Sequence, residues 1–443
     1  MTELVELVTA AAAGGDTAGG EFVLLGFPDV NGSIRGKALR PAAFDAAVRE
    51  GTVVTDLLLA LDPTDTPITD YEQFGIRSGA GDILVRPEPD TLRELSWRLG
   101  WRICLATPYW MDGSICELAS REVLRAALRG MSDLGYDTRA AFEYEIRIRD
   151  AEDRPLSSGI SYSVGEILRF DELIGRLDPA LDGLGVELSA VHTEAGPGLL
   201  ELNVAAREGL QAADDAAYLK LAVKEVAASL GLRASFIAKT VPGEEGSSGH
   251  VHLSCWRDGA NAFATADPAA ALPAALGSAV AGILEHLPAA SLLLNPTINS
   301  YKRLVPGYFA PVNVSWGVEN RSAAVRVIRS DRRERCRIEC RRPGADANPY
   351  LALAALVAAA AVGIRRGAEP PAPVTGDAST QPELPPLPGS LEAALQAFAA
   401  DDVLREALGG RFSDYYAVSR AWELKAWQAS VSDWERARYE RAV

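Results

Sequence analysis

The sequence is poor in the residues that build disulfide frameworks and zinc sites. Its 443 residues include only five cysteines and four histidines, and no two cysteines have the CxxC spacing. An odd number of cysteines without such pairs argues against disulfide crosslinks and against a structural zinc ion. We therefore expect the cysteines to be buried thiols.

Long apolar runs and targeting signals are also missing. The two most apolar stretches, residues 271–294 and 351–362, are rich in alanine and are either interrupted or short. They predict buried helices and no membrane span. The first twenty residues lack a positively charged segment followed by an apolar core, so we expect a cytoplasmic protein.

Neither common nucleotide-binding fingerprint occurs: the chain has no GxxxxGK[ST] and no GxGxxG that follows a strand. The net charge of −16 argues against a nucleic-acid partner. Within this acidic chain, nine arginines lie between Arg321 and Arg342. Such a run is either a solvated face or a place where several anionic groups are bound.

The length and the pattern of strands predict two units. After a flexible tail at residues 1–20, residues 21–108 have short strands and an Asn31-Gly32 hairpin signal, which predict a small strand-rich domain. Residues 109–443 mix strands with longer helices, which predicts an α+β domain with a large, mostly antiparallel sheet. The proline-rich stretch 369–388 predicts a surface loop before C-terminal helices.

Acidic side chains recur at strand spacing in this second unit. Glu143 and Glu145 are two apart in an apolar strand, so both carboxylates lie on one face. Two such carboxylates repel each other unless a cation neutralises them, although a solvated strand edge would give the same pattern. A small-residue turn separates Glu194 from Glu201, and a hairpin there would return the two carboxylates to one place.

Two further strands carry polar side chains of the same kind. His250 and His252 form an HxH on one strand face, a pattern that is as often structural as metal-binding, and Glu339 alternates with Arg337 and Arg341 on another strand. Oxygen-rich ligand sets favour Mg²⁺ or Mn²⁺ over zinc. A hard metal beside many arginines is typical of phosphoryl transfer.

The stretch NPTINSYKRLVPGY at residues 295–308 resembles the glutamine synthetase family. The motifs EYE, HTE, GSSGHVHLS, ENRSAAVRV and RIECRRPGADANPYLALAAL follow in the order of that family, so the resemblance covers about residues 20–443. It implies the glutamine synthetase fold, with a small β-grasp domain before a large catalytic domain. It also implies active sites at the subunit interfaces of a ring, commonly a homo-dodecamer.

The resemblance further implies the roles of individual residues. It assigns two or three Mg²⁺ or Mn²⁺ ions to two ligand sets, one of Glu145, Glu194 and Glu201 and the other of Glu143, His250 and Glu339. It places ATP near His252, Ser254, Arg326 and Arg337. Glutamate is assigned to Gly246, His250, Arg303 and Arg341, and Arg321 is assigned to the transferred phosphate, with Arg303 also counted as catalytic.

The sequence departs from the family where the acceptor nitrogen binds. The flap motif PGYEAP reads Pro306-Gly307-Tyr308-Phe309-Ala310-Pro311 here, so the flap glutamate is Phe309. A phenyl ring cannot remove a proton from ammonium. The aspartate expected in an N-terminal DGSS motif is not evident, and only Asp56 stands near its place. Glu319 either faces an amine cation or is an exposed loop carboxylate, and Glu245 replaces an asparagine that usually precedes the loop glycine.

These departures favour a ligase that joins glutamate to an organic amine such as a polyamine or ethanolamine. Two alternatives stay open: an ordinary glutamine synthetase that uses ammonium, and a non-catalytic family member with a structural or regulatory role. The second alternative predicts loss of metal and phosphate ligands, which the sequence does not show. No tyrosine occurs between Tyr350 and Tyr415, so adenylylation control is expected to be absent.

Overall fold

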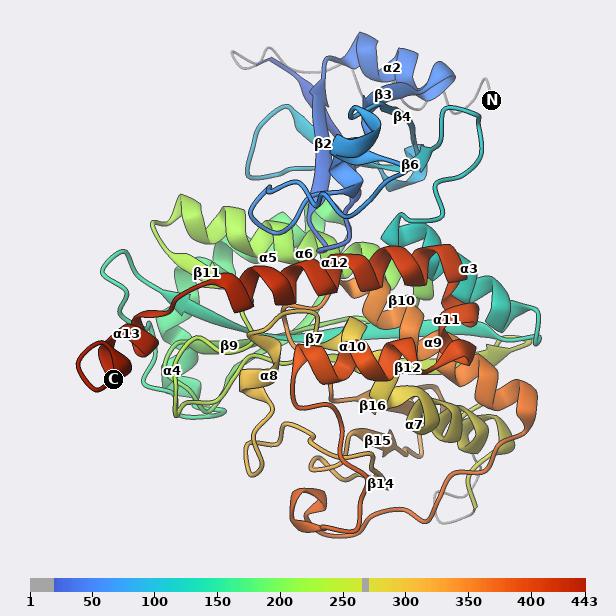
Figure 1. Cartoon of the computed structure of the whole chain (residues 1–443), viewed down its shortest axis with the longest axis vertical. Coiled ribbons are helices and arrows are strands. Elements are labelled where there is room, and N and C mark those ends of the chain that lie inside the picture. Colours follow the sequence, from blue (N-terminus) through green and yellow to red (C-terminus); the bar gives the residue numbers. More distant parts are fainter. Residues whose placement is uncertain (1–19, 265–270) are drawn as a thin grey trace.

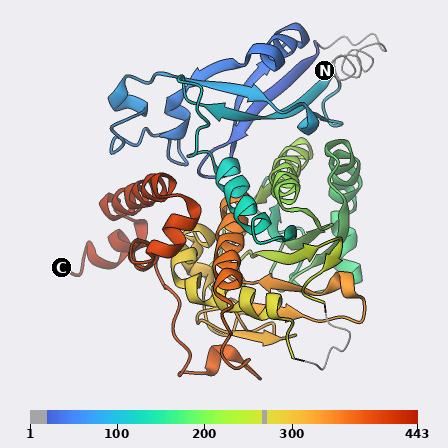
Figure 2. The same cartoon turned by 90° about the vertical axis from the view of Figure 1, so that its right-hand side faces the viewer.

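The computed structural model describes residues 20–264 and 271–443, so most of the predicted N-terminal tail lies outside the described residues. The described chain contains two separate sheets (Figure 1). The strands β1–β6 lie at one end of the molecule in both views, and the second sheet lies among the helices of the rest of the chain (Figure 2). The sequence-based division at residues 108 and 109 stays a prediction.

The first sheet has the strand order β2-β1-β6-β4-β3, with β5 paired to β6. Its first hairpin turns at Asn31 and Gly32, where Gly32 has a φ of 85° that suits glycine. Strands β1 and β6 run parallel, and the other pairs are antiparallel. The elements of this part are β1 (Phe22–Pro28), β2 (Ile34–Leu39), α2 (Pro41–Glu50), β3 (Thr52–Thr55), β4 (Asp82–Pro87), β5 (Arg93–Glu94) and β6 (Trp101–Tyr109).

The second sheet has the order β14-β15-β16-β12-β7-β9-β8, with β10 and β11 paired to β7 and β13 paired to β12. All of its described pairs are antiparallel except β14 with β15, as predicted. Its strands are β7 (Asp137–Arg149), β8 (Leu188–Thr193), β9 (Leu199–Val204), β10 (Arg207–Glu208), β11 (Arg233–Ser235), β12 (Gly249–Arg257), β13 (Ala260–Asn261), β14 (Trp316–Val318), β15 (Val325–Ile328) and β16 (Arg337–Cys340).

Helices cover this sheet and follow it at the C-terminus. The helices are α3 (Ser120–Ser132), α4 (Val164–Ile167), α5 (Asp171–Leu184), α6 (Gly209–Ser229), α7 (Ala274–Leu294), α8 (Ser300–Arg303), α9 (Pro349–Arg366), α10 (Leu391–Ala399), α11 (Asp402–Leu408), α12 (Gly410–Ala429) and α13 (Asp433–Tyr439). The proline-rich stretch before α10 contains only one short 3₁₀ turn, in line with the predicted loop.

The central strand β7 separates the core from the polar side of the sheet. Phe142, Tyr144 and Ile146 are at most 1% exposed, and α3 and α6 pack against this strand. Their neighbours Glu143 and Glu145 point to the opposite face, because successive side chains of a strand alternate. Burial of one face therefore fixes the direction of both carboxylates.

The apolar stretches form α7 and α9, which pack against each other. Both helices are long and apolar enough to cross a membrane by length and composition alone, contrary to the expectation from the sequence, but each has 83% of its most apolar window buried inside the protein. They are core helices, as expected. The five cysteines are free and buried, which confirms the prediction for them.

A lysine ammonium lies beneath the core face of β7. Lys220 of α6 donates a hydrogen bond from Nζ to the Ala347 carbonyl at 2.7 Å, and Nζ lies 4.8 Å from the centre of the Tyr144 ring. Burial lowers the pKa of Lys220 to about 7. The folded state disfavours the charged form of Lys220, so burial of this side chain destabilises the fold. The destabilisation has its full size below pH 7 and disappears as the pH rises from about 7 toward the ordinary lysine pKa of 10.5.

We expect the Lys220→Met variant to be more stable than the wild type by about 1–2 kcal/mol at pH 6, the lost hydrogen bond offsetting part of the gain. The gain should shrink by pH 9.5. Urea denaturation at both pH values measures it, with the exposed Lys425→Met as the control. An equal gain at both pH values would show that the ammonium is not destabilised by burial.

Candidate active site

The register of the large sheet brings the predicted polar residues into one row. Glu143 of β7 pairs with His250 of β12, and Glu145 pairs with Glu201 of β9. On the next strand, Glu339 of β16 pairs with His252. Side chains of directly paired residues share a face of the sheet, so all of these groups lie on the side away from the helices.

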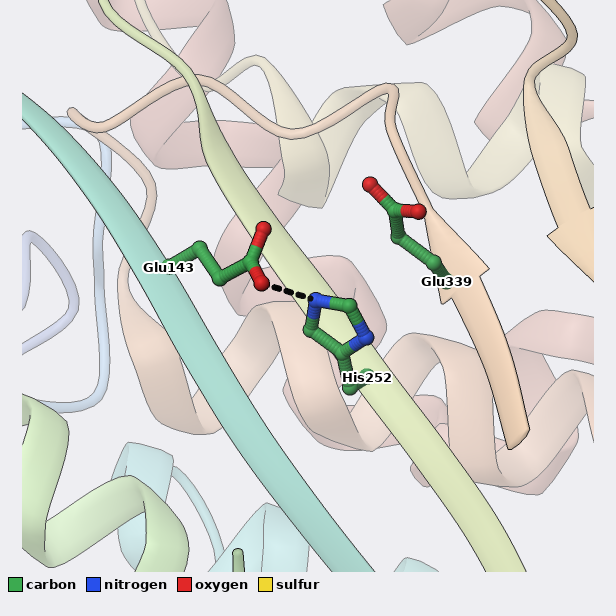
Figure 3. A group of neighbouring side chains, drawn as sticks. All are labelled: Glu143, His252 and Glu339. Carbon is green, nitrogen blue, oxygen red and sulfur yellow. Dashed lines mark ion pairs between the residues drawn. The ribbon is translucent and has the colours of Figure 1, made fainter. Parts of the chain in front are cut away.

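The first cluster joins three neighbouring strands. Glu143, His252 and Glu339 point toward one another, and their ligand atoms lie within 4.8 Å (Figure 3). His252 Nε2 is 3.0 Å from Glu143 Oε1, and Arg337 Nε donates to His252 Nδ1 at 3.0 Å. His250 Nδ1 lies 3.6 Å from Glu143 and 3.5 Å from Glu339, so it borders the same cluster.

The second cluster lies at the β8–β9 hairpin, where the predicted turn returns Glu201 beside Glu194. His192 Nε2 is 3.0 Å from Glu194 Oε1 and 3.6 Å from Glu201 Oε1. Asn203 Nδ2 donates to Glu201 Oε1 at 2.8 Å. The three ligand atoms of His192, Glu194 and Glu201 lie within 4.8 Å.

The grouping differs in part from the one that the resemblance implied. His192 takes the expected place of Glu145, whose Oε2 accepts a hydrogen bond from the Ser248 N–H at 2.7 Å. His252 takes the place of His250 beside Glu143 and Glu339. Both expected residues still line the same cavity, so the assignment of individual ligands stays a prediction.

Burial and neighbouring charges together shift the pKa of several carboxyl groups at the site. Burial raises the pKa of Glu201 to about 8, with Glu143 and Glu145 adding repulsion. Burial together with the nearby Glu145 raises the pKa of Glu245 to about 7. Burial would also raise the pKa of Glu339, but Arg341 and the two nearby histidines outweigh it and lower this pKa to about 2.

The donor set fits a hard divalent cation. Four carboxylates and two or three imidazoles converge from five strands, and several carboxylates repel one another in the absence of a positive charge. Carboxylate oxygens with a minority of imidazole nitrogens suit Mg²⁺ or Mn²⁺. The observation that supports a cation is therefore the raised pKa of Glu201, which burial causes first and repulsion from Glu143 and Glu145 second.

A cavity of about 910 Å³ lies over both clusters. Most residues predicted for the site line it: Glu143, Glu145, Glu194, Glu201, Gly246, His250, His252, Arg303, Phe309, Arg321, Arg326, Arg337, Glu339 and Arg341. Five of them are arginines, so part of the arginine-rich run lines a site rather than a solvated face. Ser254 lines an adjoining cavity of about 580 Å³, whose wall shares Glu143, His252 and Arg337 with the first.

The residues predicted for glutamate form one corner of this cavity. Gly246 lies against Arg303, and a Cβ at this position would come within 2.4 Å of the Ala238 carbonyl oxygen. Arg303 is 4% exposed, and its two terminal nitrogens donate to the carbonyl oxygens of Arg341 and Arg342. These bonds hold the guanidinium at the edge of the cavity, where it suits a carboxylate.

The residues predicted for the acceptor do not all meet in one place. Phe309 lines the main cavity, is 62% exposed and has a φ of 52°, which is rare for a residue with a side chain. Glu319 lines a neighbouring cavity of about 620 Å³ that shares Phe309 and Arg321 with the first. Asp56 lies in neither; its carboxylate accepts a hydrogen bond from the Gly75 N–H at 3.1 Å.

The site includes Tyr162, which was not predicted, and His192, which lies in the HTE motif but to which no role was assigned. The ring of Tyr162 lies 4.1 Å from the ring of His192 and is stacked on it, and both line the main cavity. The strand spacing of His192 and Glu194 is visible in the sequence and could have identified His192. Tyr162 comes from the loop before α4, where no periodic pattern points to a site.

The unfavourable burial of Glu201 can be tested by replacing its carboxyl group. We expect Glu201→Gln to stabilise the metal-free protein by about 1 kcal/mol at pH 7, since folding no longer has to protonate a carboxyl group whose pKa is raised from 4.5 to about 8. Mg²⁺ or Mn²⁺ at 100 times its Kd should stabilise the wild type by about 2.7 kcal/mol and the variant far less. Thermal unfolding with and without the metal measures both effects, with the exposed Glu172→Gln as the control. An unchanged metal response in Glu201→Gln would contradict the assignment.

The comparisons with known proteins agree with this geometry. Residues 117–439 match the family model for the glutamine synthetase catalytic domain. A glutamate–isopropylamine ligase from a Pseudomonas species is 33% identical, with 95% of each chain covered. A γ-glutamylethanolamide synthetase from Streptomyces coelicolor is 35% identical over 99% of this chain and 96% of its own length.

Ordinary glutamine synthetases are similar to the same degree. The glutamine synthetase of Thermotoga maritima is 33% identical, with 94% of this chain and 96% of the relative covered. Among solved structures, that of ligand-free GmaS covers 100% of both chains with a TM-score of 0.86 and 27% identity.

Fold and site together define a ligase that has a carboxylate- and imidazole-lined centre beside a cluster of arginines. The chain belongs to the glutamine synthetase family. The fold is the glutamine synthetase fold, which confirms the prediction from the sequence.

Proposed function

We propose that this protein is an ATP-dependent ligase that phosphorylates the γ-carboxylate of glutamate and transfers the γ-glutamyl group to an organic amine, such as a polyamine or ethanolamine. The observation that carries the proposal is Phe309, an apolar ring on the rim of a cavity whose lining includes every residue predicted for the metals and for glutamate. The names of two relatives, an isopropylamine ligase and an ethanolamide synthetase, support it.

In this proposal, one set of residues binds ATP and another set binds glutamate. His252, Ser254, Arg326 and Arg337 would bind ATP, and Gly246, His250, Arg303 and Arg341 would bind glutamate. Two or three Mg²⁺ or Mn²⁺ ions, held by the two clusters, would neutralise charge on the phosphates. Arg321, which also lines the cavity, would stabilise the phosphoryl group during transfer.

Activation is needed because a carboxylate is a poor electrophile. Phosphorylation of its oxygen creates a good leaving group, which the amine nitrogen then displaces. Phe309 gives the rim of the cavity an aromatic face, which suits the carbon chain of an amine and attracts its cationic head through a weak cation–π contact. Ammonium has no carbon chain to occupy such a wall.

The acceptor half of the site is incomplete in one chain. Asp56 does not line the cavity, so we propose that it reaches the site of a neighbouring subunit in a homo-dodecamer with active sites at the subunit interfaces. The proposed location is the cytoplasm, without a membrane or nucleic-acid partner.

The second candidate is an ordinary glutamine synthetase, favoured by relatives of that name at similar identity. ATP-dependent phosphate release with glutamate and Mg²⁺ separates the two, measured across ammonium, ethanolamine, putrescine, spermidine and simple alkylamines, with the products checked by mass. Turnover with an organic amine at least about tenfold above that with ammonium is the expected result. A preference for ammonium would overturn the proposal, and no turnover with any acceptor would favour the non-catalytic reading.

A further inference from the structure

Glu319 is bound on both of its carboxylate oxygens. It follows β14, has a φ of 52°, and is the residue at which the chain turns back toward β15. Its Oε2 accepts a hydrogen bond from Arg326 Nη2 at 2.5 Å, and its Oε1 accepts one from the Arg329 N–H at 3.0 Å. The carboxylate is therefore fixed from the side chain and from the backbone at once.

Arg326 also forms an ion pair with Glu339, a residue of the first cluster. The two residues are cross-strand partners of β15 and β16, and Arg326 Nη1 donates to Glu339 Oε2 at 3.0 Å. Its third nitrogen, Nε, is buried and has no hydrogen-bond partner in the described residues, and Arg326 lines the main cavity.

We propose that Glu319 is a positioning residue for the nucleotide half of the site rather than a ligand of the amine. Two carboxylates hold the two terminal nitrogens of the Arg326 guanidinium, which fixes its plane. The guanidinium of Arg326, a residue that lines the main cavity, then keeps a constant orientation beside the anionic phosphates that would occupy it. This inference rests on the proposed function only in that a nucleotide binds beside Arg326.

The amine-binding alternative is disfavoured by the same contacts. An ammonium group that approached Glu319 would have to displace Arg326, a charged partner at 2.5 Å that already neutralises the carboxylate. Glu319 also does not line the main cavity and lines the neighbouring one instead. A side chain that faced the amine would leave its oxygens free.

Glu339 alone would not hold Arg326 in the same way. With Glu319 removed, one terminal nitrogen of Arg326 loses its acceptor, and the side chain can rotate about its single remaining ion pair. A flexible arginine must then be ordered when the nucleotide binds, and that cost appears as weaker binding. The acceptor amine and glutamate do not depend on this orientation.

The test uses Glu319→Gln, which keeps the shape and removes the charge. ADP binding in the presence of Mg²⁺, measured by calorimetry on the whole protein, should weaken about 5- to 20-fold, while the KM values for glutamate and the amine change less than twofold. Glu319→Asp, which keeps the charge, should recover part of the affinity. The control is Glu285→Gln, which breaks an exposed ion pair with Arg366 at 2.9 Å.

A double-mutant cycle identifies the route of the effect. In an Arg326→Gln background, Glu319→Gln should cause no further loss of ADP affinity, because its partner is absent. An equal loss in both backgrounds, or a tenfold rise in the KM for the amine with unchanged ADP affinity, would overturn the inference. A wild type that binds ADP but uses only ammonium would overturn the proposed acceptor and leave this inference intact.

Discussion

Replacing Glu339 with glutamine is expected to lower ATP-dependent phosphate release by about 10³-fold or more. Glu339 is 1% exposed and holds two arginines at once, Arg326 at 3.0 Å through Oε2 and Arg341 through Oε1. It also belongs to the cluster with Glu143 and His252. The substitution therefore removes a proposed cation ligand and the counter-charge of two arginines in one step.

The same variant should lose stability. The pKa of Glu339 is lowered to about 2, against the effect of burial and because of Arg341, so this carboxylate stabilises the folded state above its ordinary pKa of 4.5 and loses that effect only as the pH falls toward 2. Removing one member of a buried ion pair costs about 3–5 kcal/mol. Chemical denaturation at pH 7 and phosphate release measure the two effects.

A matched control separates charge from position. Glu383→Gln removes a carboxylate from the exposed loop before α10 and should leave both measurements unchanged. A Glu339→Gln protein that keeps more than about a tenth of the wild-type activity would contradict the role given to this carboxylate, whatever its stability.

The row of carboxylates was predictable because strand periodicity is local. Glu143 and Glu145 alternate with buried apolar residues, and that alternation alone places both on one face. The HxH and the Arg337–Arg341 segment carry the same signal. Which strand lies beside which is not local, and the resemblance to a family supplied that order; the observed pairing of β7 with β9 and β12 agrees with it.

The details that were not predictable depend on side-chain directions. Period-two spacing places His250 and His252 on one face but does not say which imidazole reaches Glu143, and the nearer ring is that of His252. Tyr162 approaches His192 from an irregular loop with a positive φ, for which the sequence has no pattern. The sequence left Glu319 either as a residue that faces the amine or as an exposed loop carboxylate, because its partner Arg326 is seven residues away across a turn.

The last prediction concerns the ring at the rim of the cavity. Replacing Phe309 with glutamate puts a carboxylate beside Arg321, where both side chains line the main cavity. A carboxylate can bind ammonium and take its proton, which a phenyl ring cannot do. We expect the ratio of kcat/KM for ammonium to that for the preferred organic amine to rise about 10²-fold, from a gain with ammonium and a loss of apolar contact with the amine.

Phe309→Leu is the matched control, because it keeps an apolar side chain and adds no charge. It should weaken binding of the amine by about 1–2 kcal/mol through lost contact and leave ammonium unused. Both substitutions share the positive φ of this position, so any effect of backbone strain cancels between them. If Phe309→Glu and Phe309→Leu changed the acceptor ratio equally, the identity of the flap side chain would not select the nucleophile. The selection would then come from other groups at the site, and Asp56, which we propose reaches it from a neighbouring subunit, would be the first to test.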